Sequence, residues 1–81
     1  MSCYVDVKEL KKIMIDQDVN TIAELSDKTG VNRNTLSDVL SGKSYPSADT
    51  MVKLTEGLNM DGSIAGKIFF AKKLTEYVSF E

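Results

Sequence analysis

The chain has 81 residues, of which 42% are apolar and 27% are charged, with five glycines and one proline. This composition is that of an ordinary globular domain and excludes a disordered or fibrous chain. A chain of this length buries only roughly 60–65% of the surface that it exposes when unfolded, which leaves little room for an enclosed active site. We therefore expect one domain over residues 1–81, with a core over 6–70, a tail over 71–81 and no cofactor.

The formal net charge is −2, which argues against a protein that coats DNA without regard to sequence, because such binding needs broad neutralisation of phosphates. A reader of DNA sequence is not excluded, since it needs positive charge on one face only. Cys3 is the only cysteine and histidine is absent, so an internal disulfide is excluded and a metal site is not expected. No apolar run reaches the roughly 18 residues that span a bilayer, and the first residues lack the layout of a signal peptide. A cytoplasmic protein is expected.

The first predicted element is an amphipathic helix from about Asp6 to Gln17. Its apolar residues Val7, Leu10 and Met14 fall at positions i, i+3 and i+7, and its lysines lie mostly elsewhere on the helical wheel.

A second helix is predicted to open at Thr21, after the polar break at 18–20. Glu24 follows three residues later, which is the spacing of a capping box. The helix is expected to stop at Gly30, because glycine adopts the left-handed conformation of a helix C-terminus without steric cost. Val31, directly after it, is expected to pack back onto the domain. The second helix, between Thr21 and Gly30, is therefore expected to have only eight or nine residues.

A third helix is predicted to start at once, with Asn32 as its N-cap. Leu36, Val39 and Leu40 form an apolar stripe, and Gly42 ends the helix.

Two more helices are predicted in the second half of the chain. The residue before Pro46 is pushed out of the helical region, so 43–46 is expected to be a loop, and Ser47 is expected to cap the fourth helix. The inward-facing residues of this helix are Met51, Leu54 and Leu58. After a break at 59–62, a helical spacing returns in Ile64, Ala65, Ile68 and Phe69.

The tail is ambiguous. Tyr77–Phe80 is strand-like in composition, and Cys3–Val7 alternates in polarity. One interpretation is that the two ends of the chain pair as strands, and the other is that the tail is extended.

The outer face of the third helix carries short polar side chains. Asn34, Ser37, Asp38 and Ser41 lie at i, i+3, i+4 and i+7, with Arg33 at the N-terminal end. A solvated helix face usually carries Glu and Lys, which favour helix more than Asn, Ser and Asp do. Contact with a polar partner explains this choice, and a weak surface helix is the alternative.

Three of these side chains can form hydrogen bonds with the edges of DNA bases. Arg33 is the only arginine in the chain, and its planar fork matches O6 and N7 of guanine, although it also suits a phosphate or plain solvent. Asn34 suits N6 and N7 of adenine or a hydrogen bond within the first helical turn. Asp38 can accept from N4 of cytosine, orient Arg33 or Asn34, or merely repel phosphates.

Donors flank this face on both sides. Thr21 and the first amides of the second helix are placed to attract a phosphate, since a helix N-terminus attracts anions. Asn32, Lys43 and Ser44 are placed to grip on the other side. Such contacts set the register of the protein on DNA but read no sequence.

The run from residue 21 to residue 47 resembles the Cro/repressor-type helix-turn-helix family, which includes lambda-like phage repressors and their relatives on mobile elements. The resemblance is carried by residues 21–37, TIAELSDKTGVNRNTLS, by Ser41-Gly42-Lys43 and by Pro46-Ser47, and it covers about residues 7–60. The family pattern is a Leu-Ala pair, a Gly-Val turn and a Ser/Thr-rich recognition helix that ends in Asn-Gly-Lys. The segment 65–70 is similar to the last helix of small phage-encoded members. Ile22 departs from the pattern, because many members place a phosphate-binding glutamine there.

This resemblance implies an all-α, compact five-helix bundle that binds a double-stranded DNA operator. The residues expected to contact bases are Arg33, Asn34, Ser37 and Asp38. The residues expected to contact phosphates are Thr21, Asn32, Thr35, Lys43 and Ser44.

We therefore expect a transcriptional regulator, a repressor, that inserts helix 32–41 into the major groove. One short helix reads few base pairs, so a homodimer on paired half-sites is expected, at least on DNA. An enzyme is the weakest alternative, since histidine is absent and the acidic residues are scattered. The stronger alternative is a protein-binding module, similar to an antirepressor or antitoxin. Its aromatic C-terminal end would consist of Phe69, Phe70, Tyr77 and Phe80.

Overall fold

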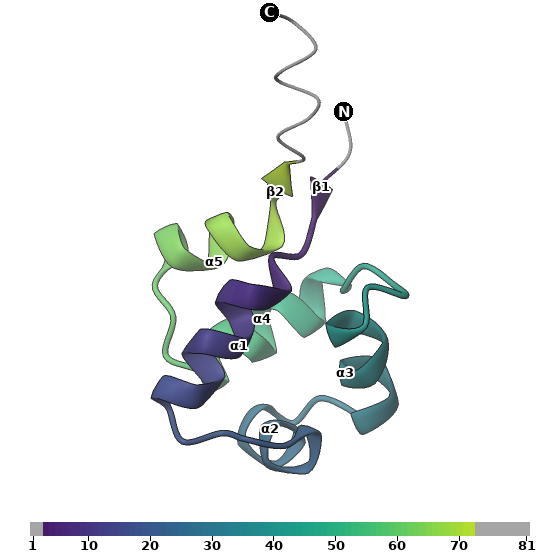
Figure 1. Cartoon of the computed structure of the whole chain (residues 1–81), viewed down its shortest axis with the longest axis vertical. Helices are drawn as coiled ribbons and strands as arrows, with labels where there is room; N and C mark the ends of the chain where they lie inside the picture. The colour runs from purple at the N-terminus through teal and green to yellow at the C-terminus, as the bar shows by residue number, and fades with distance from the viewer. Residues whose placement is uncertain (1–2, 73–81) are drawn as a thin grey trace, which may run out of the picture.

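A computed structural model of the chain describes residues 3–72 and shows an all-α fold of five helices (Figure 1). The helices are α1 (Val7–Asp16), α2 (Ile22–Thr29), α3 (Arg33–Leu40), α4 (Ala48–Gly57) and α5 (Gly62–Phe69). Two short strands, β1 (Cys3–Tyr4) and β2 (Ala71–Lys72), lie before α1 and after α5. None of the helices in this part of the chain is long and apolar enough to cross a membrane. The predicted five-helix bundle is confirmed.

The helices begin where capping side chains occur in the sequence. Thr21, Asn32 and Ser47 are the N-caps of α2, α3 and α4, as predicted, and each accepts a hydrogen bond from an amide of the first turn. The predicted start of the fifth helix was too late, because Gly62 belongs to α5 and not to the preceding break. The reason is Asp61, whose carboxylate accepts from the amide of Ile64 at 2.8 Å and so caps the helix one residue before Gly62.

A single apolar core joins the five helices. The fully buried leucines come from α1, α2, α3 and α4 and from Leu58, the C-cap of α4, and Ile68 and Phe69 supply the contribution of α5. Two core residues, Val19 and Met60, lie in connections that were predicted only as breaks between helices. The members of the core are Leu10, Met14, Val19, Leu25, Val31, Leu36, Leu54, Leu58, Met60, Ile68 and Phe69.

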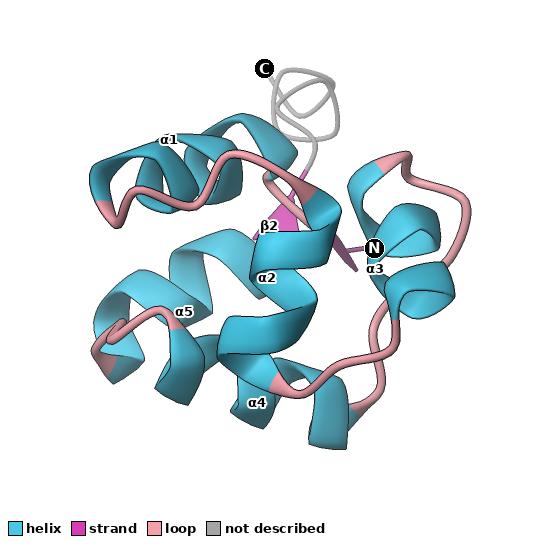
Figure 2. Cartoon of the chain, turned by 90° about the horizontal axis from the view of Figure 1, so that it is seen from below, coloured by secondary structure: helices cyan, strands magenta, loops and turns pink. Residues whose placement is uncertain are grey.

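The arrangement leaves α3 at one edge of the molecule. α2 packs on both α3 and α4, whereas α5 packs on α1 and α4. Figure 2 shows α3 at one side, with α1 and α5 toward the opposite side. α3 therefore buries one face against the bundle and turns the other outward.

The two ends of the described chain meet beside α5 (Figure 1). β1 and β2 pair antiparallel, with Cys3 opposite Lys72 and Tyr4 opposite Ala71. A pairing of the two ends was one of the two predicted alternatives for the tail, but the C-terminal partner is Ala71–Lys72. The segment Tyr77–Phe80, which was expected to supply that strand, lies outside the described residues.

Candidate functional site

The turn between α2 and α3 is fixed by local hydrogen bonds. Gly30 has a φ of +80°, which confirms the predicted left-handed helix end. The Ser26 hydroxyl donates to the carbonyl of Val31 at 2.6 Å, and the Thr29 hydroxyl donates to the carbonyl of Leu25 at 2.7 Å. Val31 is 5% exposed and anchors the start of the next helix in the core. Because both ends of the turn are held, the angle between α2 and α3 is fixed.

The exposed face of α3 is centred on Arg33, Asn34 and Ser37. Successive residues of an α-helix are rotated by about 100°, which places these three side chains on adjoining parts of the surface. All three are exposed. Within residues 3–72 their side chains form no hydrogen bond or ion pair. They are therefore available to an external partner.

Asp38 differs from the other residues of the polar stripe, because it is half-buried. Its carboxylate forms no ion pair or hydrogen bond with Arg33 or Asn34 in the described chain, so the interpretation that it orients them has no support in the free protein. Its backbone carbonyl accepts from the amide of Lys43 at 2.8 Å and from that of Ser44 at 3.2 Å. The loop after α3 is thereby folded onto the end of the helix.

The predicted phosphate-contacting residues surround α3. Asn32 is exposed at the N-terminus of α3, where its Oδ1 accepts from the Asn34 amide at 2.8 Å, and its Nδ2 donates no hydrogen bond within residues 3–72. Thr35 is half-buried along the helix. Lys43 and Ser44 are exposed in the loop that follows. Since the amides of Lys43 and Ser44 bond to the Asp38 carbonyl, these two residues would donate to a phosphate through their side chains.

Thr21 is already engaged at the start of α2. Its hydroxyl accepts from the Glu24 amide at 3.1 Å and donates to Glu24 Oε1 at 3.3 Å, which confirms the capping box. The same carboxylate oxygen accepts from the amides of Asn20 at 2.9 Å and of Thr21 at 3.1 Å. A phosphate contact from Thr21 would therefore have to replace one of these bonds. Ile22, which departs from the family pattern, is half-buried and packs against the core.

One basic residue that sequence reasoning did not select lies beside this helix start. Lys11 of α1 lines a shallow depression together with Asn20, Thr21 and Leu40, the last residue of α3. The sequence pattern contains no signal for this, because periodicity places Lys11 outside the buried face of α1 but does not say which element lies next to it.

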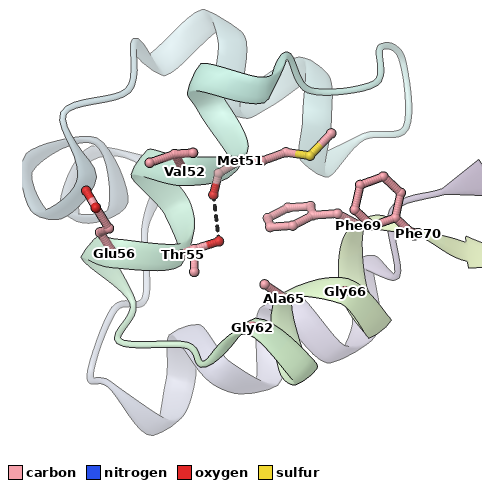
Figure 3. Close-up of a pocket in the computed structure, with 9 residues that line it drawn as sticks. All are labelled: Met51, Val52, Thr55, Glu56, Gly62, Ala65, Gly66, Phe69 and Phe70. Carbon is pink, nitrogen blue, oxygen red and sulfur yellow. Dashed lines mark hydrogen bonds between the residues drawn. The ribbon is translucent and has the colours of Figure 1, made fainter.

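Two residues of the predicted aromatic C-terminal end, Phe69 and Phe70, lie within the described part of the chain. Phe69 is 1% exposed and belongs to the core, so its prediction as part of a protein-binding surface is wrong. Phe70 is 55% exposed and lines a depression between α4 and α5 with Met51 and Val52 (Figure 3). The other two aromatic residues of that prediction, Tyr77 and Phe80, lie outside the described residues.

Residues 3–72 contain no group of three or more Cys, Asp or Glu side chains placed to hold a metal ion. The two ion pairs found there, Lys12–Glu9 at 3.4 Å and Lys53–Asp49 at 3.1 Å, lie on α1 and α4. Neither of these ion pairs includes a basic residue of α3 or of the loop that follows it.

Comparison with known proteins supports the interpretation of this region. A model of the helix-turn-helix family, of the Cro/C1 type, matches residues 10–63 of the chain. Comparison with curated proteins and with solved structures found no match. The matched residues run from the first half of α1 to the start of α5 and include the whole of α2 and α3.

Proposed function

The chain belongs to the Cro/C1-type helix-turn-helix family of DNA-binding transcription regulators, and we propose that it represses transcription by inserting α3 into the major groove of an operator. α3 and its two caps correspond to the helix 32–41 of the sequence prediction. In this docking the first helix of the pair crosses the DNA backbone, while the second presents its N-terminal residues to base edges.

The observation that carries the proposal is the state of Arg33, Asn34 and Ser37. Three polar side chains with different hydrogen-bonding capacity adjoin each other on one exposed helix face, without an intramolecular partner in the described chain. Arg33 presents a donor fork, Asn34 both a donor and an acceptor, and Ser37 a rotatable hydroxyl. Base edges in the major groove present matching patterns of donors and acceptors.

The electrostatics of α3 favour an anionic partner. Arg33 is the first residue of the helix, and the first turn contains no acidic residue. A positive charge at that position is unfavourable to the helix dipole by about 0.3–1 kcal/mol. A partner that carries negative charge, such as a nucleic acid backbone, offsets this cost.

We assign base contacts to Arg33, Asn34, Ser37 and Asp38, with Asp38 accepting from a cytosine N4 at the half-buried edge of the face. The phosphate contacts are assigned to Thr21, Asn32, Thr35, Lys43 and Ser44. The chain acts on DNA as a homodimer, because one helix of eight residues reads too few base pairs to select an operator, and two half-sites about one helical turn apart double the information.

The proposal is tested by selection of bound duplexes from a random pool at moderate ionic strength. A recovered consensus with two related halves is the expected result. Affinity for that duplex should fall with salt along a log–log slope of about −4 to −5 for each subunit, corresponding to roughly 4–6 phosphates. If no duplex is enriched over successive rounds, the function is not sequence-specific DNA binding. If the chain instead associates with a partner through an interaction that salt does not weaken, that result would favour a protein-binding function at the exposed Phe70.

A further inference from the structure

The last turn of α5 is bonded to two segments from distant parts of the chain. Carbonyls in the last turn of a helix have no partner within the helix. The carbonyl of Ile68 accepts from the amide of Asp6, two residues after β1, at 2.7 Å. The carbonyl of Phe69 accepts from the hydroxyl of Tyr45, in the loop after α3. The N-terminal segment and the loop are therefore held by adjacent carbonyls of α5.

The loop after α3 also adjoins the N-terminal strand. Ser44 and Tyr45 line a shallow depression together with Tyr4 of β1 and with Val5. Tyr4 lies opposite Ala71 in the strand pair, and β2 follows the end of α5 after one residue. The loop is thus connected to the strand pair in two ways, through the depression that it shares with β1 and through the hydrogen bond to the end of α5.

The strand pair is the part of this region that opens most easily. β1 and β2 contain two residues each, and Tyr4 is 41% exposed. Local opening needs least free energy where few buried apolar contacts are lost, and a pair of strands without further packing is marginally stable. The end of α5, by contrast, is anchored in the core by Ile68 and Phe69, each 1% exposed. The strands can therefore open while the bundle stays folded.

We propose that closure of the strand pair and binding of a duplex are linked, with Tyr45 as the connection. The inference rests on the proposed function, in which Lys43 and Ser44 of the loop contact phosphates. Paired strands support Tyr45 and the loop, whereas open strands remove that support and leave the loop to be ordered when DNA binds. Linkage is reciprocal, so a duplex that binds the supported loop also stabilises the closed strands. Any event that opens the strands would lower the affinity for DNA.

The first test measures hydrogen exchange of the Asp6 amide, which reports on the attachment of the N-terminal segment to α5. Saturation with the selected duplex should slow this exchange by about fivefold or more, the low end of the usual coupling between two sites. Tyr45→Phe, which lacks the hydroxyl that bonds to Phe69, should lose most of the slowing. Tyr4→Phe is the matched control and should retain it, because the Tyr4 hydroxyl forms no hydrogen bond within residues 3–72.

The second test closes the strands covalently in the free protein. Cys3 and Lys72 are opposed in the antiparallel register, and opposed residues of such a pair have Cα atoms about 4.5 or 5.5 Å apart, a separation that a disulfide can bridge. Oxidation of Lys72→Cys should slow exchange of the Lys43 amide, which bonds to the Asp38 carbonyl at 2.8 Å and reports on the loop. Adding Tyr45→Phe should remove this effect.

Lys72→Ser is the control for the second test, since it removes the same charge but cannot form the bridge. Mass spectrometry shows whether the disulfide lies within one chain, and thermal unfolding confirms that each variant is folded. If the bridge does not form, the exchange of the Asp6 amide in the complex decides the question.

Two results of the first test would overturn the linkage: an unchanged exchange rate of the Asp6 amide in the complex, or equal slowing in the unmodified chain and in Tyr45→Phe. Unchanged exchange of the Lys43 amide after closure of the bridge would overturn it as well, whether or not a duplex binds. If the unmodified chain binds no duplex, the proposed function itself is wrong. The second test needs no DNA, so the two failures are distinguishable.

Discussion

Arg33 concentrates the specificity question in one side chain. It is the only arginine of the chain, it is exposed, and it occupies the first position of α3. A guanidinium group can form two parallel hydrogen bonds with guanine or with a phosphate, and the free protein does not distinguish these partners.

Replacing Arg33 by Ala is expected to weaken binding to the selected duplex by roughly 1–3 kcal/mol and to relax the preference at one base pair. The cause is the loss of a bidentate base contact, so affinity for a random duplex should change little. The measurement is a binding titration of both duplexes and of variants of the selected duplex at each base pair. An equal loss on all duplexes would assign Arg33 to a phosphate.

At the scale of elements, the arrangement of α2 and α3 depends on how closely α2 approaches α4. A Cβ atom added at Gly57, the last residue of α4, would lie 2.6 Å from Thr29 Cγ2 and 2.9 Å from Thr29 Cα. Real Cβ atoms do not approach backbone atoms so closely, so α2 would have to move. Thr29 also bonds to Leu25 and Val31 in the turn before α3, and a displaced α2 would disturb that turn.

Gly57→Ala is therefore expected to lower the free energy of unfolding by about 1–3 kcal/mol, the usual cost of overpacking, although alanine favours helix over glycine by about 1 kcal/mol. Gly66→Ala in α5 is the matched control, because an added Cβ there meets nothing within 4 Å. The control should be neutral or should stabilise the protein by up to about 1 kcal/mol. Denaturant unfolding measures both. A stabilised Gly57→Ala variant would show that α2 and α4 are less tightly apposed.

At the scale of the whole molecule, the loop after α3 is tied to the far end of the bundle. The Tyr45 hydroxyl donates to the carbonyl of Phe69, the last residue of α5. Tyr45 and Ser44 also line a depression with Tyr4 and Val5 near the N-terminal strand. The loop that carries Lys43 and Ser44 is thus positioned by contacts with both ends of the described chain.

Tyr45→Phe should destabilise the protein by about 0.5–1.5 kcal/mol, the net value of one hydrogen bond, and should weaken binding to all duplexes alike by releasing the loop. Tyr4→Phe is the control, since the hydroxyl of Tyr4 forms no hydrogen bond within residues 3–72. Unfolding and duplex binding are measured for both variants. If Tyr45→Phe binds the duplexes like the unmodified chain, the hydrogen bond from Tyr45 to Phe69 does not hold the loop in position for binding.

The dimer proposal belongs to the same scale. Two chains should bind each selected duplex. A duplex with only one half-site should bind far more weakly, because only one of the two recognition helices then has bases to contact. Altering the spacing of the half-sites by five base pairs should abolish tight binding, since it turns the second half-site to the opposite face of the DNA. Analytical ultracentrifugation of the complexes gives the stoichiometry. Tight 1:1 binding to a single half-site would contradict the proposal.

Local chemistry in the sequence determined most of the elements of this protein. The threonine, asparagine and serine caps, the capping box and the left-handed Gly30 are all found where short-range hydrogen bonding and backbone sterics place them. The fifth helix starts earlier than predicted because an aspartate cap, Asp61, was overlooked, although it was visible in the sequence.

The tertiary structure alone decided which surfaces meet. Burial of Val19 and Met60 in connecting segments, the pairing of Ala71 with Tyr4, the close approach at Gly57 and the position of Lys11 beside Leu40 all join residues far apart along the chain. Helical periodicity reports which face of an element is apolar but not the element against which it packs. The exposed polar face of α3 could therefore be predicted from one helix, whereas its flanks depend on how five helices pack together.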